Sequence, residues 1–183
     1  MASWLFQYGG EEAQHEVYDA LPVRARFALQ RDAPMLGIVP KGWYSTAAAT
    51  ALVAGAERRA APAERELYLR DLGTHIMREG INVFYRSLFK LFVSPRSLIE
   101  NAETAWQRYY SEGDVEAGMT GRGRALVSFL NWQGHTRALC EVGGYSALHL
   151  LENVGAREPR VRWLHCLEDG APERCQWEYS WQE

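Results

Sequence analysis

The sequence predicts an α+β fold, in which N-terminal helices are followed by a ββαββ unit with an antiparallel sheet. Apolar residues recur at helical spacing through the first half of the chain, and short alternating runs replace them after Glu112-Gly113-Asp114. The 183 residues are 47% hydrophobic and 23% charged, which is typical of a globular protein and sufficient for one domain. We therefore expect one core shared by helices and sheet.

Four helices are expected in series, and local signals mark where three of them begin. Ser45 and Ser94 are of the residue type that caps a helix N-terminus, and Pro62 and Pro95 suit the first turn. Apolar residues continue at helical spacing after each of these signals. The predicted helices are residues 46–60, 62–79, 82–92 and 95–109.

The first 40 residues are expected to form an N-terminal arm. Aromatic residues are interrupted there by Pro22, Pro34 and Pro40, which is too irregular for a long helix and too apolar for a disordered tail. The arm would pack either on the domain's own core or on a partner subunit. Residues 41–183 are predicted to form a single α/β domain.

The second half of the chain is expected to form the sheet and one covering helix. Strands are predicted over 115–118, 124–132, 160–167 and 174–181, and a helix over 137–153 that ends before Gly155. Asp169-Gly170-Ala171-Pro172 reads as the connection of a final hairpin.

The charge balance and the cysteine count restrict the class of protein. Twenty Lys and Arg against 23 Asp and Glu give a net charge of −3, which predicts no nucleic-acid partner. No apolar run approaches the ~18 residues of a membrane span. Three cysteines, an odd number, favour reduced thiols or a metal site over a disulfide framework, and hence a cytoplasmic protein.

The three cysteines are predicted to converge. A hairpin centred on Gly170 and Ala171 places Cys166 opposite Cys175, and Cys140 lies near the start of the helix that covers the same sheet. Three thiolates suit a structural Zn²⁺, for which His165, Glu168, His135 and Glu141 are candidate fourth ligands. The alternative is that the cysteines pack as small hydrophobic residues.

The C-terminal third resembles the 4-vinyl reductase domain family, through Cys140–Glu152, Val161–Cys166, Gly170 and Cys175-Gln176-Trp177. This family is related to the sensor domains of aromatic-responsive transcriptional activators and to the core subunits of the TRAPP tethering complex. The resemblance implies that Cys140, Cys166 and Cys175 ligate zinc, although Trp163 occupies the position of the sensors' Glu ligand. We take His165 as the remaining candidate ligand.

The chain carries two further resemblances. The Leu72-Gly73 stretch and the helix end at Trp106, Tyr109 and Tyr110 are similar to a paralogous myxobacterial family, which implies no activity. The chain more distantly resembles the haem-based nitric-oxide sensor fold. His75 and Tyr85-Arg86-Ser87 are the residues that could serve a haem, but Phe89 stands where the propionate-binding motif needs Arg. We therefore expect no haem.

Aromatic residues of the ββαββ unit are candidates for a ligand cavity, since such pockets have apolar and aromatic linings. The alternative is that they only fill the core. The predicted ligand-binding residues are Phe129, Trp132, His135, Tyr145 and Trp163.

The sequence carries no hydrolase nucleophile elbow, metalloprotease His pair, P-loop or Cys-x-x-Cys motif, so we expect no enzymatic activity. The main interpretation is a cytoplasmic, homodimeric sensor or regulatory domain that binds a small hydrophobic molecule and holds a structural zinc. The first alternative is a dimerisation or tethering module resembling the TRAPP subunits. The second is a haem-based gas sensor.

Overall fold

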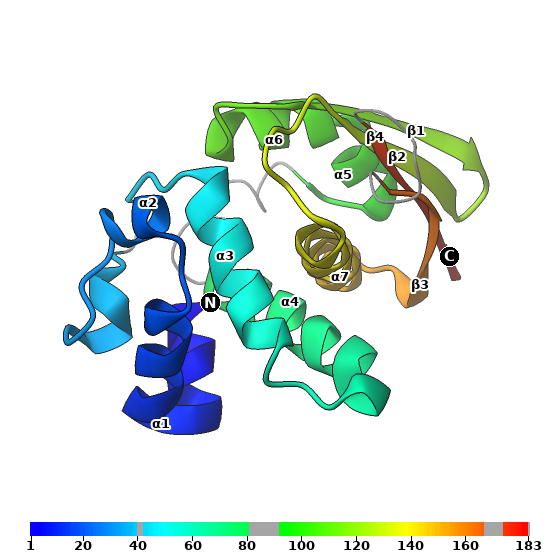
Figure 1. The fold of residues 1–183 in the computed structure, drawn as a ribbon. Coiled ribbons are helices and arrows are strands. Elements are labelled where there is room, and N and C mark those ends of the chain that lie inside the picture. Colours follow the sequence, from blue (N-terminus) through cyan, green and yellow to red (C-terminus); the bar gives the residue numbers. More distant parts are fainter. Residues whose placement is uncertain (40–41, 81–91, 167–173, 183) are drawn as a thin grey trace.

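The computed structural model describes residues 1–39, 42–80, 92–166 and 174–182, and it has the predicted α+β architecture (Figure 1). Helices occupy the first part of the chain, and a four-stranded antiparallel sheet with one long helix occupies the second. The elements are α1 (Ala2–Asp19), α2 (Val23–Arg26), η1 (Pro34–Gly37), α3 (Thr46–Glu57), η2 (Pro62–Glu64), α4 (Arg65–Gly80), α5 (Pro95–Glu100), α6 (Ala102–Tyr109), β1 (Asp114–Gly121), β2 (Arg124–Leu130), α7 (Arg137–Asn153), β3 (Arg157–His165) and β4 (Arg174–Gln182).

The sheet has the strand order β1-β2-β4-β3, and every neighbouring pair is antiparallel. Period-two alternation along β4 turns Cys175, Trp177 and Tyr179 inward, and all three are buried. In the pairing of β2 with β4, Phe129 lies opposite Cys175 and Val127 opposite Trp177. One face of the sheet thus supplies a wall of large apolar side chains to the core.

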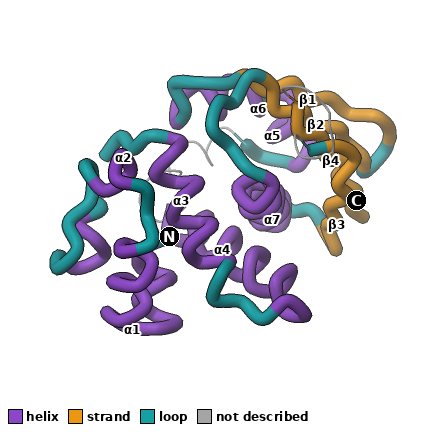
Figure 2. The backbone as a smooth tube through the Cα atoms, viewed as in Figure 1, coloured by secondary structure: helices purple, strands orange, loops and turns teal. Residues whose placement is uncertain are grey.

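Helix α7 lies between this sheet and the helical layer, and it is seen end-on near the centre of Figure 1. It packs on α3 and α4 on one side and on β3 and β4 on the other. Figure 2 shows the resulting separation of the purple helical layer from the orange sheet. Since both sides of α7 are covered, most of its residues are buried, including the polar Glu141 and Ser146.

Two of the three predicted helix starts are confirmed by their caps, whereas Pro62 opens the 3-10 helix η2, which has no side-chain cap and leads into α4. The Ser45 side chain accepts a hydrogen bond from the Ala48 backbone N–H, at 3.2 Å. Ser94 and Ser97 form a reciprocal capping box. The predicted helix over 95–109 is divided at Asn101, whose backbone leaves the helical region, and this separates α5 from α6.

The described part of the first 40 residues contains no long uninterrupted helix, as predicted. Helix α1 consists of two helical segments that meet at a kink, because Gly10 adopts the non-helical angles φ 63° and ψ −158°. Trp4 is fully buried, and its indole N–H donates to Asp71 Oδ2 of α4 at 2.8 Å. Helix α1 therefore packs on the chain's own helical layer.

Two sequence predictions fall outside the described residues. They are most of the helix over 82–92, with Tyr85, Ser87 and Phe89, and the hairpin connection at 169–172, with the neighbouring Glu168.

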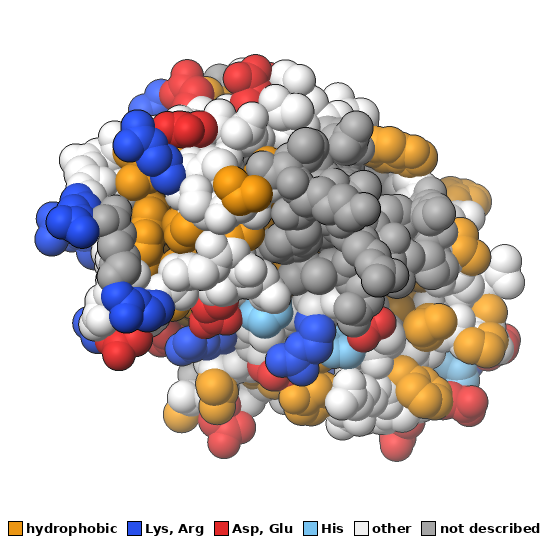
Figure 3. Space-filling view, turned by 180° about the vertical axis from the view of Figure 1, so that it is seen from behind, with side chains coloured by type: hydrophobic (Ala, Val, Ile, Leu, Met, Phe, Trp, Pro, Cys, Tyr) orange, Lys and Arg blue, Asp and Glu red, His pale blue; other side chains and the backbone are white. Residues whose placement is uncertain are grey.

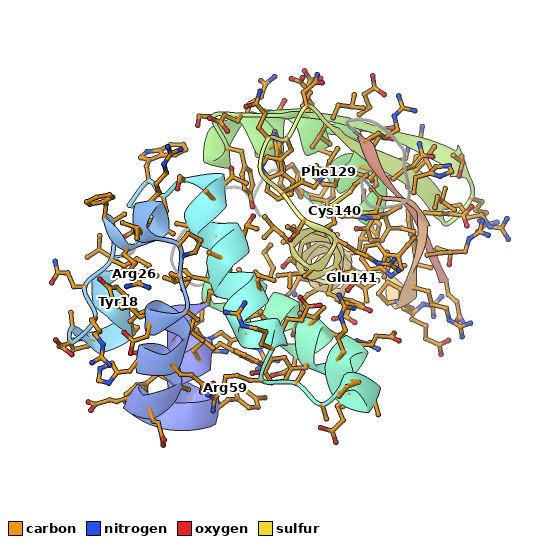
Figure 4. All side chains as sticks on the ribbon, in the orientation of Figure 1. Tyr18, Arg26, Arg59, Phe129, Cys140 and Glu141 are labelled. Atoms are coloured by element: carbon orange, nitrogen blue, oxygen red, sulfur yellow. A yellow bond between two sulfur atoms is a disulfide. The ribbon has the colours of Figure 1, made fainter. Side chains whose placement is uncertain are left out.

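The described surface carries both signs of charge. On the face shown in Figure 3, basic, acidic and apolar side chains all reach the surface, and several of the apolar ones adjoin one another. The Arg26 guanidinium lies 5.7 Å from the centre of the Tyr18 ring, and both residues are labelled in Figure 4. Among the described helices, none has the length and apolar character needed to cross a membrane.

The closest approach of α4 to α7 depends on Gly73. A Cβ at this position would lie 2.6 Å from the Val142 carbonyl oxygen and 2.9 Å from Tyr145 Cβ. We predict that Gly73→Ala lowers the free energy of unfolding by about 1–2 kcal/mol, because overpacking outweighs the gain in helix propensity. Urea titration with Gly118→Ala as the control, where nothing lies within 4 Å, measures the difference. Equal stability of the two variants would contradict this account of the α4–α7 contact.

Candidate functional site

A cavity of about 270 Å³ lies between the helices and the sheet. Helices α4, α5, α6 and α7 form its walls together with the inward face of β1, β2 and β4. The described residues that line it are Met1, Ala49, Ile76, Met77, Leu98, Ile99, Ala102, Ala105, Trp106, Tyr110, Val115, Val127, Phe129, Trp132, Leu139, Val142, Gly143, Ser146, Ala147, Leu150, Leu151, Trp177 and Tyr179.

One end of the cavity is an aromatic cluster. Trp106 stacks on Tyr110 with ring centres 3.8 Å apart, and it meets Phe129 edge-on at 4.8 Å and Trp132 edge-on at 5.0 Å. Such tilted and edge-on contacts are the arrangements that aromatic pairs favour. These rings form an aromatic wall at this end of the cavity.

The lining contains one buried donor that the described residues do not satisfy. Trp132 is 6% exposed, and its Nε1–H has no hydrogen-bond partner. The other buried polar groups of the lining are paired: Ser146 Oγ donates to the Gly73 carbonyl at 3.0 Å, and the Tyr179 hydroxyl donates to the Gly144 carbonyl at 3.3 Å. Leaving a buried donor unpaired costs ~1–3 kcal/mol, so this N–H is available to an acceptor on a ligand.

The three cysteines converge as the sequence predicts, beside this cavity. Cys140, Cys166 and Cys175 are all buried, and the sulfurs of Cys166 and Cys175 lie 3.0 Å apart. However, Cys140 and Cys175 form a disulfide, with Cys166 outside it. The contact forms because Cys175, an inward-facing residue of β4, meets Cys140 in the first turn of α7.

His135, rather than His165, joins the cysteines. His135 Nε2 lies 3.3 Å from Cys175 Sγ, and the ring is buried against Trp132 with centres 5.3 Å apart. His165 is exposed on β3, even though the pairing of β3 with β4 shifts register between Trp163 and His165. The histidine beside the cysteines is therefore His135, from the loop between β2 and α7, and not the predicted His165 of β3.

The predicted ligand-binding residues are divided between three places. Phe129 and Trp132 line the cavity, and His135 lies with the cysteines. Tyr145 faces α4, where its hydroxyl donates to Glu66 Oε1 at 3.3 Å. Trp163 meets Tyr145 and Trp177 edge-on, and it lines a small space beside Cys140 and Cys166.

Sequence reasoning did not assign α4, α5 and α6 to the cavity. The apolar residues Leu98, Ile99, Ala102, Ala105 and Trp106 were recognised at helical spacing, which indicates a buried face without showing what it faces.

A charge network fixes α7 against α4. Buried Glu141 accepts hydrogen bonds from Arg65 at 2.6 Å and from Arg137 at 3.1 Å, and Arg65 also donates to Glu57 at 2.5 Å. Figure 4 labels Glu141 and Cys140, neighbours on α7, together with Phe129 of the sheet. The network connects α3, α4 and α7, and so fixes the helices on which the cavity residues stand.

The comparisons with known proteins identify the fold. No family model and no curated protein matches the sequence. Among solved structures, the chain is similar to an Fe(II) unliganded H-NOX protein mutant from K. algicida, with a TM-score of 0.70, 12% identity and coverage of 100% of this chain and 92% of that chain. It is also similar to an H-NOX protein from S. oneidensis in the Fe(II)NO ligation state, with a TM-score of 0.69, 12% identity and coverage of 99% and 94%. A T. tengcongensis H-NOX mutant gives a TM-score of 0.64, 9% identity and coverage of 100% and 93%. The chain therefore has the H-NOX fold over its full described length.

These neighbours correct three expectations. The assignment to the 4-vinyl reductase and TRAPP-related family is wrong, because full-length matches are to H-NOX proteins and no family model supports the C-terminal resemblance. The expectation of no haem is contradicted. The matching structures include an Fe(II) unliganded H-NOX protein and an H-NOX protein in which the function of heme distortion was probed. The expectation of zinc finds no support in these neighbours, which are described by Fe(II) and heme.

The raised pKa of the Tyr145 phenol predicts that the fold loses stability at alkaline pH. Burial, with the Glu66 and Glu141 carboxylates nearby, raises the pKa of Tyr145 to about 12. A phenol whose pKa is higher in the folded than in the unfolded chain stabilises the fold below pH ~10 and loses that contribution as pH rises towards 12. Tyr145→Phe should therefore make the free energy of unfolding fall less steeply between pH 10 and 12. Identical slopes in urea titrations of parent and variant would refute the assignment.

Proposed function

We propose that the chain is a haem-based gas-sensing domain. The observation that carries the proposal is the full-length similarity to H-NOX structures described in Fe(II) and Fe(II)NO states. The cavity between α4, α5, α6, α7 and the sheet is the place in this fold that would hold the haem. This similarity favours the haem interpretation over the tethering module and over the zinc-containing sensor.

The walls of the cavity suit a flat apolar macrocycle. Leu98, Ile99 and Ala102 present aliphatic or small side chains, while Trp106 and Phe129 present aromatic rings. Ligand cavities of this type are mostly apolar with a few placed polar groups. The Trp132 N–H is suited to hold a propionate oxygen or another acceptor at the aromatic end.

The iron ligand would differ from the proximal histidine common in haem proteins. Among the described residues that line the cavity there is no histidine, and the available donors are the phenol of Tyr110 and the thioethers of Met77 and Met1. Both tyrosine and methionine serve as axial ligands of haem iron. We propose Tyr110 or Met77 as the ligand. When bound, haem supplies an iron centre at which a diatomic gas coordinates.

The remaining residues of the chain would position the group and report on it. The apolar lining excludes water, and α7 contributes one wall of the cavity while packing on β3 and β4. Movement at that wall would reach the sheet through the Gly143–Trp177 contact. We propose that the signal passes to another protein, or to a second copy of the chain, without catalysis.

A second candidate function has its own supporting observation. The absence of histidine from the described lining favours an apolar ligand without iron, bound in the same cavity through the Trp132 N–H. Such a protein would still be a small-molecule sensor with this fold.

Titration with haemin tests the proposal. We expect the parent chain to bind one equivalent, with a sharpened and shifted Soret band. Ala147→Phe, which fills the cavity, should weaken binding by ~10-fold or more, whereas Ala63→Phe, at an exposed position, should not. Equal binding by both variants would show non-specific association and would overturn the proposal. Circular dichroism of the unloaded variants controls for folding.

The iron ligand can be assigned with three variants. We expect either Tyr110→Phe or Met77→Leu to change the absorption and electron paramagnetic resonance spectra of the bound haem. His75→Gln is the matched control, because His75 lies on α4 next to the cavity but its Nε2 is paired with Ser3 Oγ at 3.1 Å. Unchanged spectra in both ligand variants would exclude Tyr110 and Met77 and would show that another group holds the iron of the bound haem.

A further inference from the structure

We propose that Arg124, Ser180 and Arg160 form a phosphate-binding site on the outer face of the sheet. Its ligand is inorganic phosphate or the phosphate group of a monoester. The site lies on the face of β4 opposite to the cavity, so the proposal does not depend on whether the cavity holds haem.

The strand register brings two arginines to one serine. On β4, Tyr179 is buried on the inner face, so the next residue, Ser180, points to the outer face. Ser180 lies opposite Arg124 of β2 on one side and opposite Arg160 of β3 on the other. Residues directly opposite each other share a face of the sheet, with Cβ atoms ~4.5–5.5 Å apart. The three residues therefore form a row across three strands, with the serine between the two arginines.

This row lacks the carboxylate that the neighbouring row has. Two residues earlier on β4, Glu178 lies opposite Arg162 of β3, and its carboxylate accepts a hydrogen bond from that guanidinium at 3.0 Å. Arg124 and Arg160 are exposed, and within the described part of the chain neither forms an ion pair or a side-chain hydrogen bond. Two cations on the strands that flank β4, with no anion between them, make a locally positive site on a chain whose net charge is −3.

The donors of the row match the oxygens of a phosphate. Each guanidinium presents a planar fork of N–H groups that can donate two parallel hydrogen bonds to phosphate oxygens, and the Ser180 hydroxyl adds a further donor. A phosphate group has three strong acceptor oxygens, whereas a carboxylate has two, so a phosphate can engage both arginines and the hydroxyl together. Glu158, two residues before Arg160 on β3, has another partner, because its carboxylate accepts from Gln182 Nε2 at 2.9 Å.

A bound phosphate would connect three strands at one end of the sheet. Arg124 is the first residue of β2, and Ser180 and Arg160 lie where β4 and β3 pair with each other. The neighbour of Ser180, Tyr179, lines the cavity from the other face of the same strand. Occupancy of the outer site would therefore hold in place a strand that also forms part of the cavity wall.

Nuclear magnetic resonance titration with inorganic phosphate tests the proposal on the whole chain. Backbone amide shifts are followed against sodium phosphate, with sodium chloride at equal ionic strength as the reference, because salt alone screens exposed charges. We expect saturable shifts centred on Ser180 with phosphate only. A parallel titration with phenyl phosphate distinguishes the two sources of the ligand. Binding of phenyl phosphate with similar affinity assigns the site to monoesters, and binding of inorganic phosphate alone assigns it to the free ion.

Three variants and a matched control locate the site. Arg124→Gln and Arg160→Gln should each weaken phosphate binding by ~10-fold or more, because each removes charge-assisted hydrogen bonds. Ser180→Glu should abolish binding, because it places a carboxylate between the two arginines. Arg174→Gln is the control and should bind like the parent, since Arg174 is an exposed arginine on the same face at the other end of β4.

The amide spectrum of each variant without phosphate shows whether the fold is retained. The proposal is overturned if phosphate and chloride shift the same amides equally, or if Arg174→Gln weakens binding as much as Arg124→Gln and Arg160→Gln. It is also overturned if a folded Ser180→Glu variant binds phosphate like the parent.

Discussion

The arrangement of this molecule depends on α7 being narrow enough to lie between two layers. Gly73 of α4 lies against the α7 backbone, where a Cβ would come within 2.6 Å of the Val142 carbonyl. On the opposite side, a Cβ at Gly144 would lie 2.4 Å from the Trp163 ring, and one at Gly143 would lie 3.3 Å from Trp177. These contacts leave no room for larger side chains. Glycines on both sides of α7 thus set the distance from the helical layer to the sheet, and the Glu141 network fixes the helix at that distance.

The cavity is a consequence of this spacing. Near Gly143 and Gly144, α7 is close to the sheet, while the cavity opens between α7, β2 and the pair α5 and α6. The aromatic residues there pack on one another rather than filling the space, and they leave the Trp132 N–H without a partner among the described residues. Both features are typical of a site built for a ligand and not of a core built for stability alone. The disulfide at Cys140 joins the same helix to the sheet close to this opening.

Local signals in the sequence predicted local structure well. Ser45 and Ser94 cap helices as expected, and the hairpin register brings Cys166 to Cys175. Features that depend on tertiary contacts were not predictable. Gly10 kinks α1 at a positive φ, and the two helical segments pack on the helical layer, whereas the sequence left open whether this arm packs on the chain itself or on a partner. His135 approaches the cysteines from a loop. The motif-based family assignment failed because it rested on the C-terminal third, whereas the fold is recognised over the full described length at 9–13% identity, too little for residue motifs to identify it.

Native mass spectrometry of the chain, produced in cells supplied with a haem precursor and purified without added ligand, tests the central claim most directly. If the cavity is a haem site, the dominant species will be the chain plus the mass of one haem, and the Ala147→Phe variant will be obtained without it. A parent chain that carries no haem, or that carries an apolar molecule of another mass displaced by the same substitution, would contradict the haem assignment.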